Sequence, residues 1–393
     1  MSSAMNKPRF QGRRVKLGEI CTLSNRRNRD GECSSVYSVT NSRGFVPSED
    51  FFSKEVYSKE LKTYRVVERD MIAYNPSRIN VGSVALQDKA DEVIVSPLYV
   101  VFSVDEEKAL PGYLVRFLKS KQGRDQISFR STGTVRNSLK FDALCLMDLH
   151  LPSMYEQRTR VDVMTRVERL IGLRFRYLSK LDDLRKSRFI EMFGDPVENP
   201  MEWPCGKLGD IGDLRNGVNF KAADSGYEVK CLGVGDFKDR YAICDTTLIS
   251  AVTLNGEPNE KQILRDGDIV FVRSNGNKQL VGRCVAVFPG SSRITFSGFC
   301  IRFRNESDRL LLDYMLGCLK SDSMRKSMIG RGANIQNLNQ GLLAKVEMPL
   351  PPLSLQQEFA SFVAQVDKLE SAARASIDKL QTLYDSLAQE YFG

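Results

Sequence analysis

The sequence contains a single histidine, His150, among its 393 residues, and no two of its nine cysteines form a C-x-x-C pair. Zinc sites use sets of cysteine and histidine ligands, and proton transfer in enzymes most often uses histidine. Both chemistries are therefore nearly excluded. We expect His150, between Leu149 and Leu151, to lie in the core at the end of a strand. Scattered cysteines in an odd number are typical of free thiols in a reducing cytoplasm.

Long hydrophobic runs are also missing. No apolar stretch approaches the roughly 18 residues that a membrane-spanning helix needs. Residues 1–13, which we expect to be an N-terminal tail, lack the apolar core of a secretory signal. The sequence therefore predicts a cytoplasmic protein.

The motifs of common catalytic sites are absent as well. No G-x-x-x-x-G-K-[ST] stretch occurs, so we expect no phosphate cradle for ATP. The segment Asn75-Pro-Ser-Arg78 lacks the second proline and the aromatic residue of the N-P-P-Y loop of amino-methyltransferases. No PD…(E/D)xK nuclease arrangement is found either. We find no catalytic residues and no metal ligands, and the sequence favours a binding protein that is not an enzyme on its own.

The composition is that of an ordinary globular protein, with 42% hydrophobic and 27% charged residues. A chain of this length is long for a single core, so two domains are expected. The net charge of +8 is consistent with a polyanionic partner.

A long helix pattern occurs twice. Residues 157–194 end in Phe-Ile-Glu-Met-Phe-Gly, and residues 356–393 end in Ala-Gln-Glu-Tyr-Phe-Gly. Shifting one onto the other by 199 positions superposes their apolar residues, which indicates an internal duplication. Residues 153–194 hold ten Lys/Arg and six Asp/Glu, whereas residues 352–393 hold three and six. Opposite net charges favour pairing of the two helices with each other.

The apolar residues of both helices recur with alternating spacings of three and four, which is the pattern of a coiled coil. We therefore expect one two-helix coiled coil joining two globular halves. The expected seam comprises Val167, Leu170, Tyr177, Leu181, Leu184, Val366, Leu369, Ala373, Leu380, Leu383 and Leu387.

The duplication extends into the globular halves. Lys16-Leu-Gly-Glu-Ile20 returns as Lys207-Leu-Gly-Asp-Ile211, and Asp70-Met-Ile-Ala-Tyr74 is matched with Asp268-Ile-Val-Phe-Val272. In each half, short β-rich segments precede one amphipathic helix, expected at residues 110–126 and 310–326. Between these landmarks, residues 21–65 and 212–262 share almost no similarity. Two related domains with divergent inserts are expected to recognise different things.

Polar, basic loops between the strands are the candidate binding residues. Arginine can recognise guanine, and asparagine or glutamine can recognise adenine, through paired hydrogen bonds in the DNA major groove. For any single residue, an exposed loop side chain without a ligand is an equally good interpretation. The candidate DNA-binding set is Arg26, Arg27, Arg29, Arg78, Asn80, Arg130, Arg136, Asn137, Arg273, Asn275, Asn277, Lys278, Arg331, Asn334 and Gln336.

This layout resembles the specificity (S) subunit of type I restriction–modification enzymes, over residues 14–393. The matching motifs are the two Lys-Leu-Gly-(Glu/Asp)-Ile segments, Asp266-Gly-Asp-Ile-Val-Phe271, Leu350-Pro-Pro-Leu-Ser-Leu-Gln-Gln357 and Ser187-Arg-Phe-Ile-Glu-Met-Phe-Gly-Asp-Pro196. The resemblance implies an α+β fold with two β-rich target-recognition domains, each followed by a long helix, and the helices pairing as an antiparallel coiled coil. The expected boundaries are 14–152 and 199–351 for the domains, with 153–198 and 352–393 for the spacer helices.

The resemblance also implies a function. Each domain would read one half of an asymmetric, bipartite double-stranded DNA target, and the helices would act as a spacer. Two modification (methyltransferase) subunits, and in some systems two restriction (translocase and nuclease) subunits, would bind the chain. S-adenosylmethionine, ATP and Mg²⁺ would be bound by those partners, and no cofactor by this chain.

Two other interpretations remain open at this point. One is an adaptor that recognises protein through duplicated domains and a coiled coil. The other is a single-chain DNA methyltransferase or nuclease with unrecognised motifs. Binding that weakens steeply with salt would favour DNA over protein as the partner. The sequence gives neither the DNA target nor the spacer length.

Overall fold

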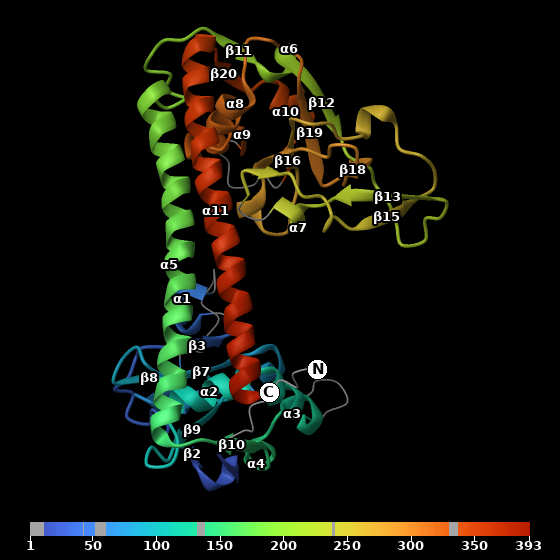
Figure 1. Cartoon of the computed structure of the whole chain (residues 1–393). Coiled ribbons are helices and arrows are strands. Elements are labelled where there is room, and N and C mark those ends of the chain that lie inside the picture. Colours follow the sequence, from blue (N-terminus) through green and yellow to red (C-terminus); the bar gives the residue numbers. More distant parts are fainter. Residues whose placement is uncertain (1–11, 42, 52–59, 132–137, 238–239, 330–336) are drawn as a thin grey trace, which may run out of the picture. The chain divides into compact units, whose positions relative to one another are not determined.

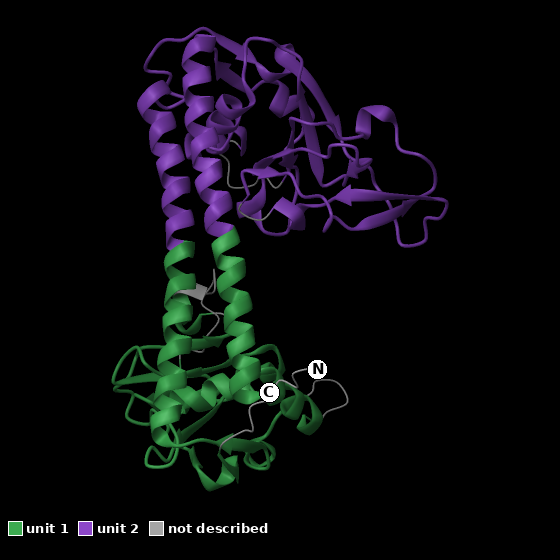
Figure 2. Cartoon of the chain, in the orientation of Figure 1, with its two compact units in different colours: residues 1–175, 375–393 green, residues 176–374 purple. Residues whose placement is uncertain are grey.

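The computed structural model describes residues 12–41, 43–51, 60–131, 138–237, 240–329 and 337–393. These residues form two compact units, residues 1–175 with 375–393 (unit 1) and residues 176–374 (unit 2), coloured green and purple in Figure 2. Helices and sheets are mixed in both, as expected for an α+β protein. The unit boundaries differ from the expected domains, because each unit contains part of both long helices.

Unit 1 is built on a four-stranded sheet in the order β2-β9-β6-β7, with smaller two-stranded pairings around it. Helices α2 and α3 follow the sheet and pack on it (Figure 1). Its elements are β1 (Arg13–Lys16), η1 (Leu17–Glu19), β2 (Cys21–Ser24), β3 (Tyr37–Thr40), β4 (Gly44–Pro47), α1 (Ser48–Phe51), η2 (Leu61–Thr63), β5 (Arg65–Glu68), β6 (Ile72–Tyr74), η3 (Ile79–Val81), β7 (Val84–Leu86), β8 (Glu92–Val95), β9 (Val100–Val104), α2 (Pro111–Lys119), α3 (Lys121–Arg130), α4 (Phe141–Cys145) and β10 (Asp148–Leu151).

Unit 2 repeats this arrangement with a five-stranded sheet, β12-β19-β16-β17-β14, and a three-stranded sheet, β15-β13-β18. Its elements are β11 (Cys205–Lys207), α6 (Leu208–Ile211), β12 (Gly212–Asn216), β13 (Tyr227–Leu232), α7 (Val234–Phe237), β14 (Ala242–Ile243), β15 (Ala251–Leu254), η4 (Glu260–Gln262), β16 (Asp268–Val272), η5 (Lys278–Leu280), β17 (Cys284–Val287), β18 (Ile294–Phe296), β19 (Cys300–Asn305), α8 (Leu312–Leu319), α9 (Asp322–Ile329), α10 (Gln340–Ala344) and β20 (Glu347–Pro349).

The strand register corrects the sequence alignment of the two halves by one residue. Tyr74 of β6 pairs with Val100, and Phe271 of β16 pairs with the matching residue Ile301. Tyr74 therefore corresponds to Phe271 and not to Val272. With this alignment the turn residue that precedes each strand also agrees, because Asp70 (φ 65°) and Gly267 (φ 84°) both have a positive φ. The shared aspartates had suggested the wrong alignment.

The single amphipathic helix expected after each sheet is in fact two helices, α2 and α3 in unit 1. Ser120 has an extended backbone, and its hydroxyl accepts a hydrogen bond from the Gly123 amide, so it begins a new helix. A side chain at Gly123 would collide with the Phe117 carbonyl. Ser321 accepts from the Met324 amide at the same point of unit 2. In each unit a serine that caps the second helix divides the single helix expected from the sequence into two.

His150 lies on β10 and is exposed, so its expected core position is wrong. Side chains of a strand alternate between its two faces. The neighbouring Leu149 is buried and so determines which face of β10 meets the core.

The two long helices, α5 (Met154–Phe193) and α11 (Leu353–Phe392), each have 40 residues. The beginning of α5 and the end of α11 lie side by side in unit 1, and the reverse holds in unit 2 (Figures 1 and 2). Tyr384 donates to Glu168 at 2.9 Å in unit 1. At the equivalent position of unit 2, Arg185 donates to Asp367 at 2.6 Å. The helices therefore pair antiparallel, and the same interhelical contact occurs once in each unit.

Burial divides the expected coiled-coil seam. Four of its residues are buried, namely Val167, Leu181, Val366 and Ala373. Leu380 and Leu387 are half-buried. Five are exposed, namely Leu170, Tyr177, Leu184, Leu369 and Leu383. A two-helix pair covers each seam residue from one side only, so leucines in it keep part of their surface in solvent.

One glutamine at the start of each long helix forms hydrogen bonds that connect the helix to the adjacent sheet domain. The Gln157 amide oxygen accepts from the Leu110 amide, and its nitrogen donates to the carbonyls of Lys108 and Pro152. Gln356 makes the same three hydrogen bonds in unit 2, at 2.8–2.9 Å. Both side chains are fully buried. The end of each long helix is held by a buried phenylalanine and not by a glutamine. Phe392 of α11 lies in the core of unit 1, and Phe193 of α5 lies in the core of unit 2.

Candidate nucleic-acid interface

The loops β6–β7 and β16–β17 occupy equivalent places in the two units and contain six of the fifteen residues that the sequence singled out. Arg78 and Asn80 are exposed in the first loop, and Asn277 and Lys278 are exposed in the second. Each loop contains a short 3₁₀ turn, η3 or η5. The duplicated frame therefore presents different basic and amide side chains at one position.

Glycine permits the return of each loop to its next strand. Gly82 and Gly282 have φ of 90° and 77°, a conformation that other residues adopt at a cost. In unit 1, the Asn75 side chain accepts a hydrogen bond from the Ser77 amide at 3.1 Å, which tightens the beginning of the loop.

Local hydrogen bonds order the loop of unit 2. The side-chain oxygen of Asn275 accepts from the Asn277 amide at 2.8 Å, and that of Asn277 accepts from the Gln279 amide at 3.0 Å. Asparagine is suited to such turns because its side chain can bond to a nearby backbone group. With one bond accepted by each oxygen, the side-chain NH₂ groups of Asn275 and Asn277 are the donors that these two residues could offer to a ligand.

Arg273 lies at the base of the same loop and is half-buried. Its backbone amide donates to the Phe299 carbonyl at 2.8 Å, and its guanidinium donates to the Gly298 carbonyl at 3.5 Å. A guanidinium has five N–H donors in a planar fork, so other donors remain for a base edge or a phosphate.

The basic cluster Arg26–Arg29 follows β2 and is held by pairing with the segment around β5. The Arg26 carbonyl accepts from the Val66 amide, and the Asn28 amide donates to the Tyr64 carbonyl, both at 3.0 Å. Arg27 and Arg29 are exposed, on either side of buried Asn28.

Arg26 differs from the other arginines of this cluster, because it forms ion pairs with Glu68 and Glu92. The hydrogen bond to Glu68 raises the pKa of the Arg26 guanidinium. Its charge is therefore compensated within the protein.

The third group of predicted residues is only partly described. Arg130 ends α3, where its guanidinium donates to the Leu146 carbonyl at 3.1 Å and lies 5.8 Å from the ring of Phe129. The remaining predicted residues lie outside the described residues, and these are Arg136, Asn137, Arg331, Asn334 and Gln336.

Three residues that the sequence did not single out lie beside these loops. Arg65 donates to the Pro97 carbonyl at 3.2 Å, and burial, followed by the charge of Arg27, lowers the pKa of its guanidinium. Leu98 and Phe299 are 80% and 62% exposed. The duplicated sequence could have pointed to Leu98 and Phe299, since Ser96-Pro-Leu and Ser297-Gly-Phe occupy matching positions in the two halves.

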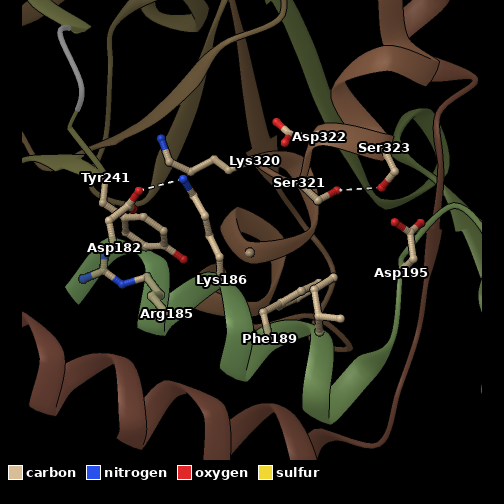
Figure 3. A pocket seen from close by; sticks show the side chains of 12 residues that line it. Asp182, Arg185, Lys186, Phe189, Asp195, Tyr241, Lys320, Ser321, Asp322 and Ser323 are labelled. Carbon is tan, nitrogen blue, oxygen red and sulfur yellow. Dashed lines mark hydrogen bonds and ion pairs between the residues drawn. The ribbon is translucent and has the colours of Figure 1, made fainter. Parts of the chain in front are cut away.

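A pocket of about 250 Å³ lies in unit 2 between α5, the α8–α9 connection and Tyr241 (Figure 3). Arg185 stacks over the Tyr241 ring at 4.2 Å, and Lys186 forms an ion pair with Asp182 at 2.7 Å. Lys320 donates to the carbonyls of Arg240 and Cys284, and burial lowers its pKa. These charges bind protein groups, so the pocket belongs to the junction between helix and domain.

The described residues offer neither a metal site nor a membrane-spanning helix. No group of three or more His, Cys, Asp or Glu side chains could hold a metal ion within the part of the chain that the structure describes. Among those same residues, no helix has both the length and the apolar character to cross a bilayer.

Comparisons with known proteins agree with this arrangement. The chain is 23% identical over 304 residues to the type I restriction enzyme StySPI specificity subunit of Salmonella potsdam, an alignment that spans 72% of this chain and 65%, just under two thirds, of the relative. Among solved structures, a chain of a type I R-M system has a TM-score of 0.56 at 20% identity, with 97% of each chain covered.

A second solved structure is the type I restriction–modification S subunit from M. genitalium. Its TM-score is 0.51 at 14% identity, with 100% of this chain and 98% of that chain covered. At such identities the two structures establish the fold. The family model described as the type I restriction modification DNA specificity domain matches twice, over residues 13–181 and 200–380. Each match covers one half of the duplicated sequence, a sheet domain with most of the long helix that follows it, and the chain belongs to the type I restriction modification DNA specificity domain family.

Proposed function

We propose that the chain is the DNA sequence-recognition subunit of a type I restriction–modification complex. Each unit reads one half of an asymmetric, bipartite double-stranded target. The observation that carries this proposal is the pair of equivalent loops, β6–β7 and β16–β17, which present different arginine, asparagine and lysine side chains. A DNA target with two different halves requires two recognition surfaces with different side chains, and the two equivalent loops provide them.

The partners supply the chemistry in this proposal. Two modification subunits bind S-adenosylmethionine and methylate adenine, and two restriction subunits, where present, use ATP and Mg²⁺. The chain itself contributes no catalytic group and acts in the cytoplasm. Helices α5 and α11 serve as the spacer, because 40 residues extend over about 60 Å at 1.5 Å per residue, more than the ~34–36 Å of one DNA turn.

Paired loop variants test the two-reader arrangement. The target is first obtained by mapping methylated adenines in cells that express the chain with its modification subunit. Asn277→Ala with Lys278→Ala is then compared with Arg78→Ala with Asn80→Ala, since all four side chains are exposed in the two loops. We expect each double variant to relax one half of the target by about 1–3 kcal/mol per lost base contact and to leave the other half unchanged. Equal relaxation of both halves by either variant would contradict the proposal.

The salt dependence of binding separates DNA recognition from the adaptor alternative, which the comparisons do not favour. A reader that contacts several phosphates loses affinity steeply between 50 and 200 mM salt. We expect this behaviour for the chain together with its modification subunits. Recovery of the tagged chain from its host with partners other than DNA enzymes would instead support the adaptor.

A further inference from the structure

An exposed apolar side chain stands at the tip of one turn in each unit. The turn connects β8 to β9 in unit 1, where the Tyr99 amide donates to the Ser96 carbonyl at 3.0 Å. The Leu98 amide donates to the Ser96 hydroxyl at 3.4 Å. This closed turn directs Leu98 outward, with 80% of its surface exposed.

Unit 2 repeats the turn between β18 and β19. The Cys300 amide donates to the Ser297 carbonyl at 2.8 Å, and the Phe299 amide donates to the Ser297 hydroxyl at 3.3 Å. Phe299 occupies the place of Leu98 and is 62% exposed. A glycine replaces the proline before it, and a side chain at Gly298 would collide with the Asn219 amide group.

A single exposed apolar residue needs no explanation, because folded proteins have many. Recurrence at an equivalent position is different. At two other positions an exposed apolar residue is not kept between the halves: Val81 is exposed whereas Val281 is buried, and Leu146 (55% exposed) is matched by the polar Lys345. An apolar residue at the tip of both turns therefore calls for an explanation that the single exposed residues do not.

An arginine is fixed beside each tip, and it comes from a different element in each unit. Arg65, at the beginning of β5, donates to the Pro97 carbonyl at 3.2 Å. Arg273, after β16, donates to the equivalent Gly298 carbonyl at 3.5 Å. The two units therefore reach one arrangement, a cation against the turn that bears an exposed apolar side chain, with non-equivalent residues.

We propose that Leu98 and Phe299 are wedges, each of which enters one base step of the bound DNA while the neighbouring arginine contacts the phosphate backbone. This inference rests on the proposed function. Apolar wedges of this kind partly unstack neighbouring bases and bend the duplex. The sequence preference they add comes from how easily a step deforms, with pyrimidine–purine steps favoured.

The test uses the full chain with its modification subunits and the duplex mapped by methylation. In this duplex 2-aminopurine replaces one adenine at a time, except the methylated adenines, because a methyltransferase flips its target base out of the stack. The fluorescence of 2-aminopurine rises when its base is unstacked. We expect a rise at one step in each half-site. Leu98→Ser should abolish the rise in one half and Phe299→Ser in the other. Each should lower affinity about tenfold or more, because the apolar contact with the bases and the contacts that the bend allows are lost.

Two controls separate a wedge from general damage. Leu248→Ser removes a residue that is 76% exposed elsewhere in unit 2 and should leave both signals unchanged. Phe299→Leu keeps an apolar wedge and should retain binding. The slope of affinity against salt should be unchanged in Phe299→Ser and smaller by about one in Arg273→Ala, because only the arginine displaces counterions.

The outcomes distinguish this inference from the function on which it rests. Wild-type affinity of Leu98→Ser and Phe299→Ser, or fluorescence that stays low at every step of a specifically bound duplex, would overturn the wedges and leave DNA recognition standing. No specific binding by the wild-type complex would overturn both.

Discussion

The junctions between long helix and domain differ in the two units, although they lie on one frame. In unit 2, four rings form a cluster, and Phe189 is 5.1 Å from Phe193, 5.7 Å from Tyr314 and 5.5 Å from Phe359, between ring centroids. Phe189 is 2% exposed. The end of α5 is therefore held by aromatic packing.

Unit 1 retains two of these four positions as aromatic residues. Phe392 and Tyr113 correspond to Phe193 and Tyr314, and their rings are 5.0 Å apart. Ala388 takes the place of Phe189, and Arg160 takes the place of Phe359. Arg160 donates to the Tyr391 carbonyl at 3.3 Å and lies over its ring at 5.1 Å.

A second exchange accompanies the loss of the Phe189 ring. A Cβ atom at Gly317 of α8 would collide with that ring. The equivalent residue of α2 is Arg116, which donates to Glu168 at 2.6 Å and to Thr165 at 2.9 Å. Phe189 and Gly317 of unit 2 thus correspond to Ala388 and Arg116 of unit 1, a large and a small residue in each case. Volume at the junction is thus conserved in sum while its chemistry changes.

The largest effect is expected from Phe189→Ala. Removal of a buried aromatic side chain costs about 3–5 kcal/mol of the free energy of unfolding. Urea unfolding is followed by Trp203 fluorescence, which reports on unit 2 because this is the only tryptophan in the sequence, and by far-ultraviolet circular dichroism, which reports on both units. Arg116→Ala is the matched change in unit 1 and should cost less, about 1–3 kcal/mol. Equal losses would show that the two junctions are energetically alike.

A double variant sharpens this prediction. Gly317→Ala alone should destabilise the protein by about 1–3 kcal/mol, since the added methyl group overpacks the junction. In the Phe189→Ala background the same change should have little effect, because the ring is gone. Additive losses would mean that the collision is relieved elsewhere.

The central sheets provide the second comparison. Arg302 is fully buried on β19 and donates to both the carboxylate and the carbonyl of Asp213, whereas unit 1 has Val101 at the equivalent position. Burial of the Asp213 carboxyl raises its pKa, but the hydrogen bonds from Arg302 and Arg215 outweigh this effect and hold the pKa of Asp213 below its ordinary value of 3.8. The stabilisation is therefore present above pH 3.8 and is lost as the pH falls through the lower, folded-state pKa.

Asp213→Thr should cost about 3 kcal/mol at neutral pH, because it leaves the buried charge of Arg302 without its carboxylate. Adding Arg302→Val, which restores the residue found in unit 1, should recover most of that loss and remove this part of the acid sensitivity. The stability of each variant is measured by urea unfolding from pH 2.5 to 7. An unchanged acid response in the double variant would assign the response to other carboxylates.

The smallest difference is expected where the two units agree. Gln157→Ala and Gln356→Ala each leave buried backbone groups without a hydrogen bond and should cost about 1–3 kcal/mol. Because both glutamines make the same three bonds, the two losses should match within about 0.5 kcal/mol. A markedly smaller loss for one of them would show that its helix start is held by other contacts.

The duplication, the two long helices and their opposite charges can be predicted from the sequence alone. These features follow from periodicity and composition, which are local properties of the chain. The equivalent loops β6–β7 and β16–β17 could also be predicted, since a polar, glycine-containing stretch after a buried strand marks a turn. The family was indicated by the order of these elements, and the match over residues 13–181 and 200–380 agrees with it.

Which residues of these patterns are exposed, paired or buried depends on the tertiary structure and cannot be predicted from the patterns. Leu369 and Val366 follow the same heptad pattern, yet one is 46% and the other 2% exposed, because a single neighbouring helix covers one side of the seam. Arg26 looks like Arg29 in the sequence, but Glu68 and Glu92 neutralise it from strands more than forty residues away. Contacts between residues distant in the chain are set by packing, and periodicity carries no record of them.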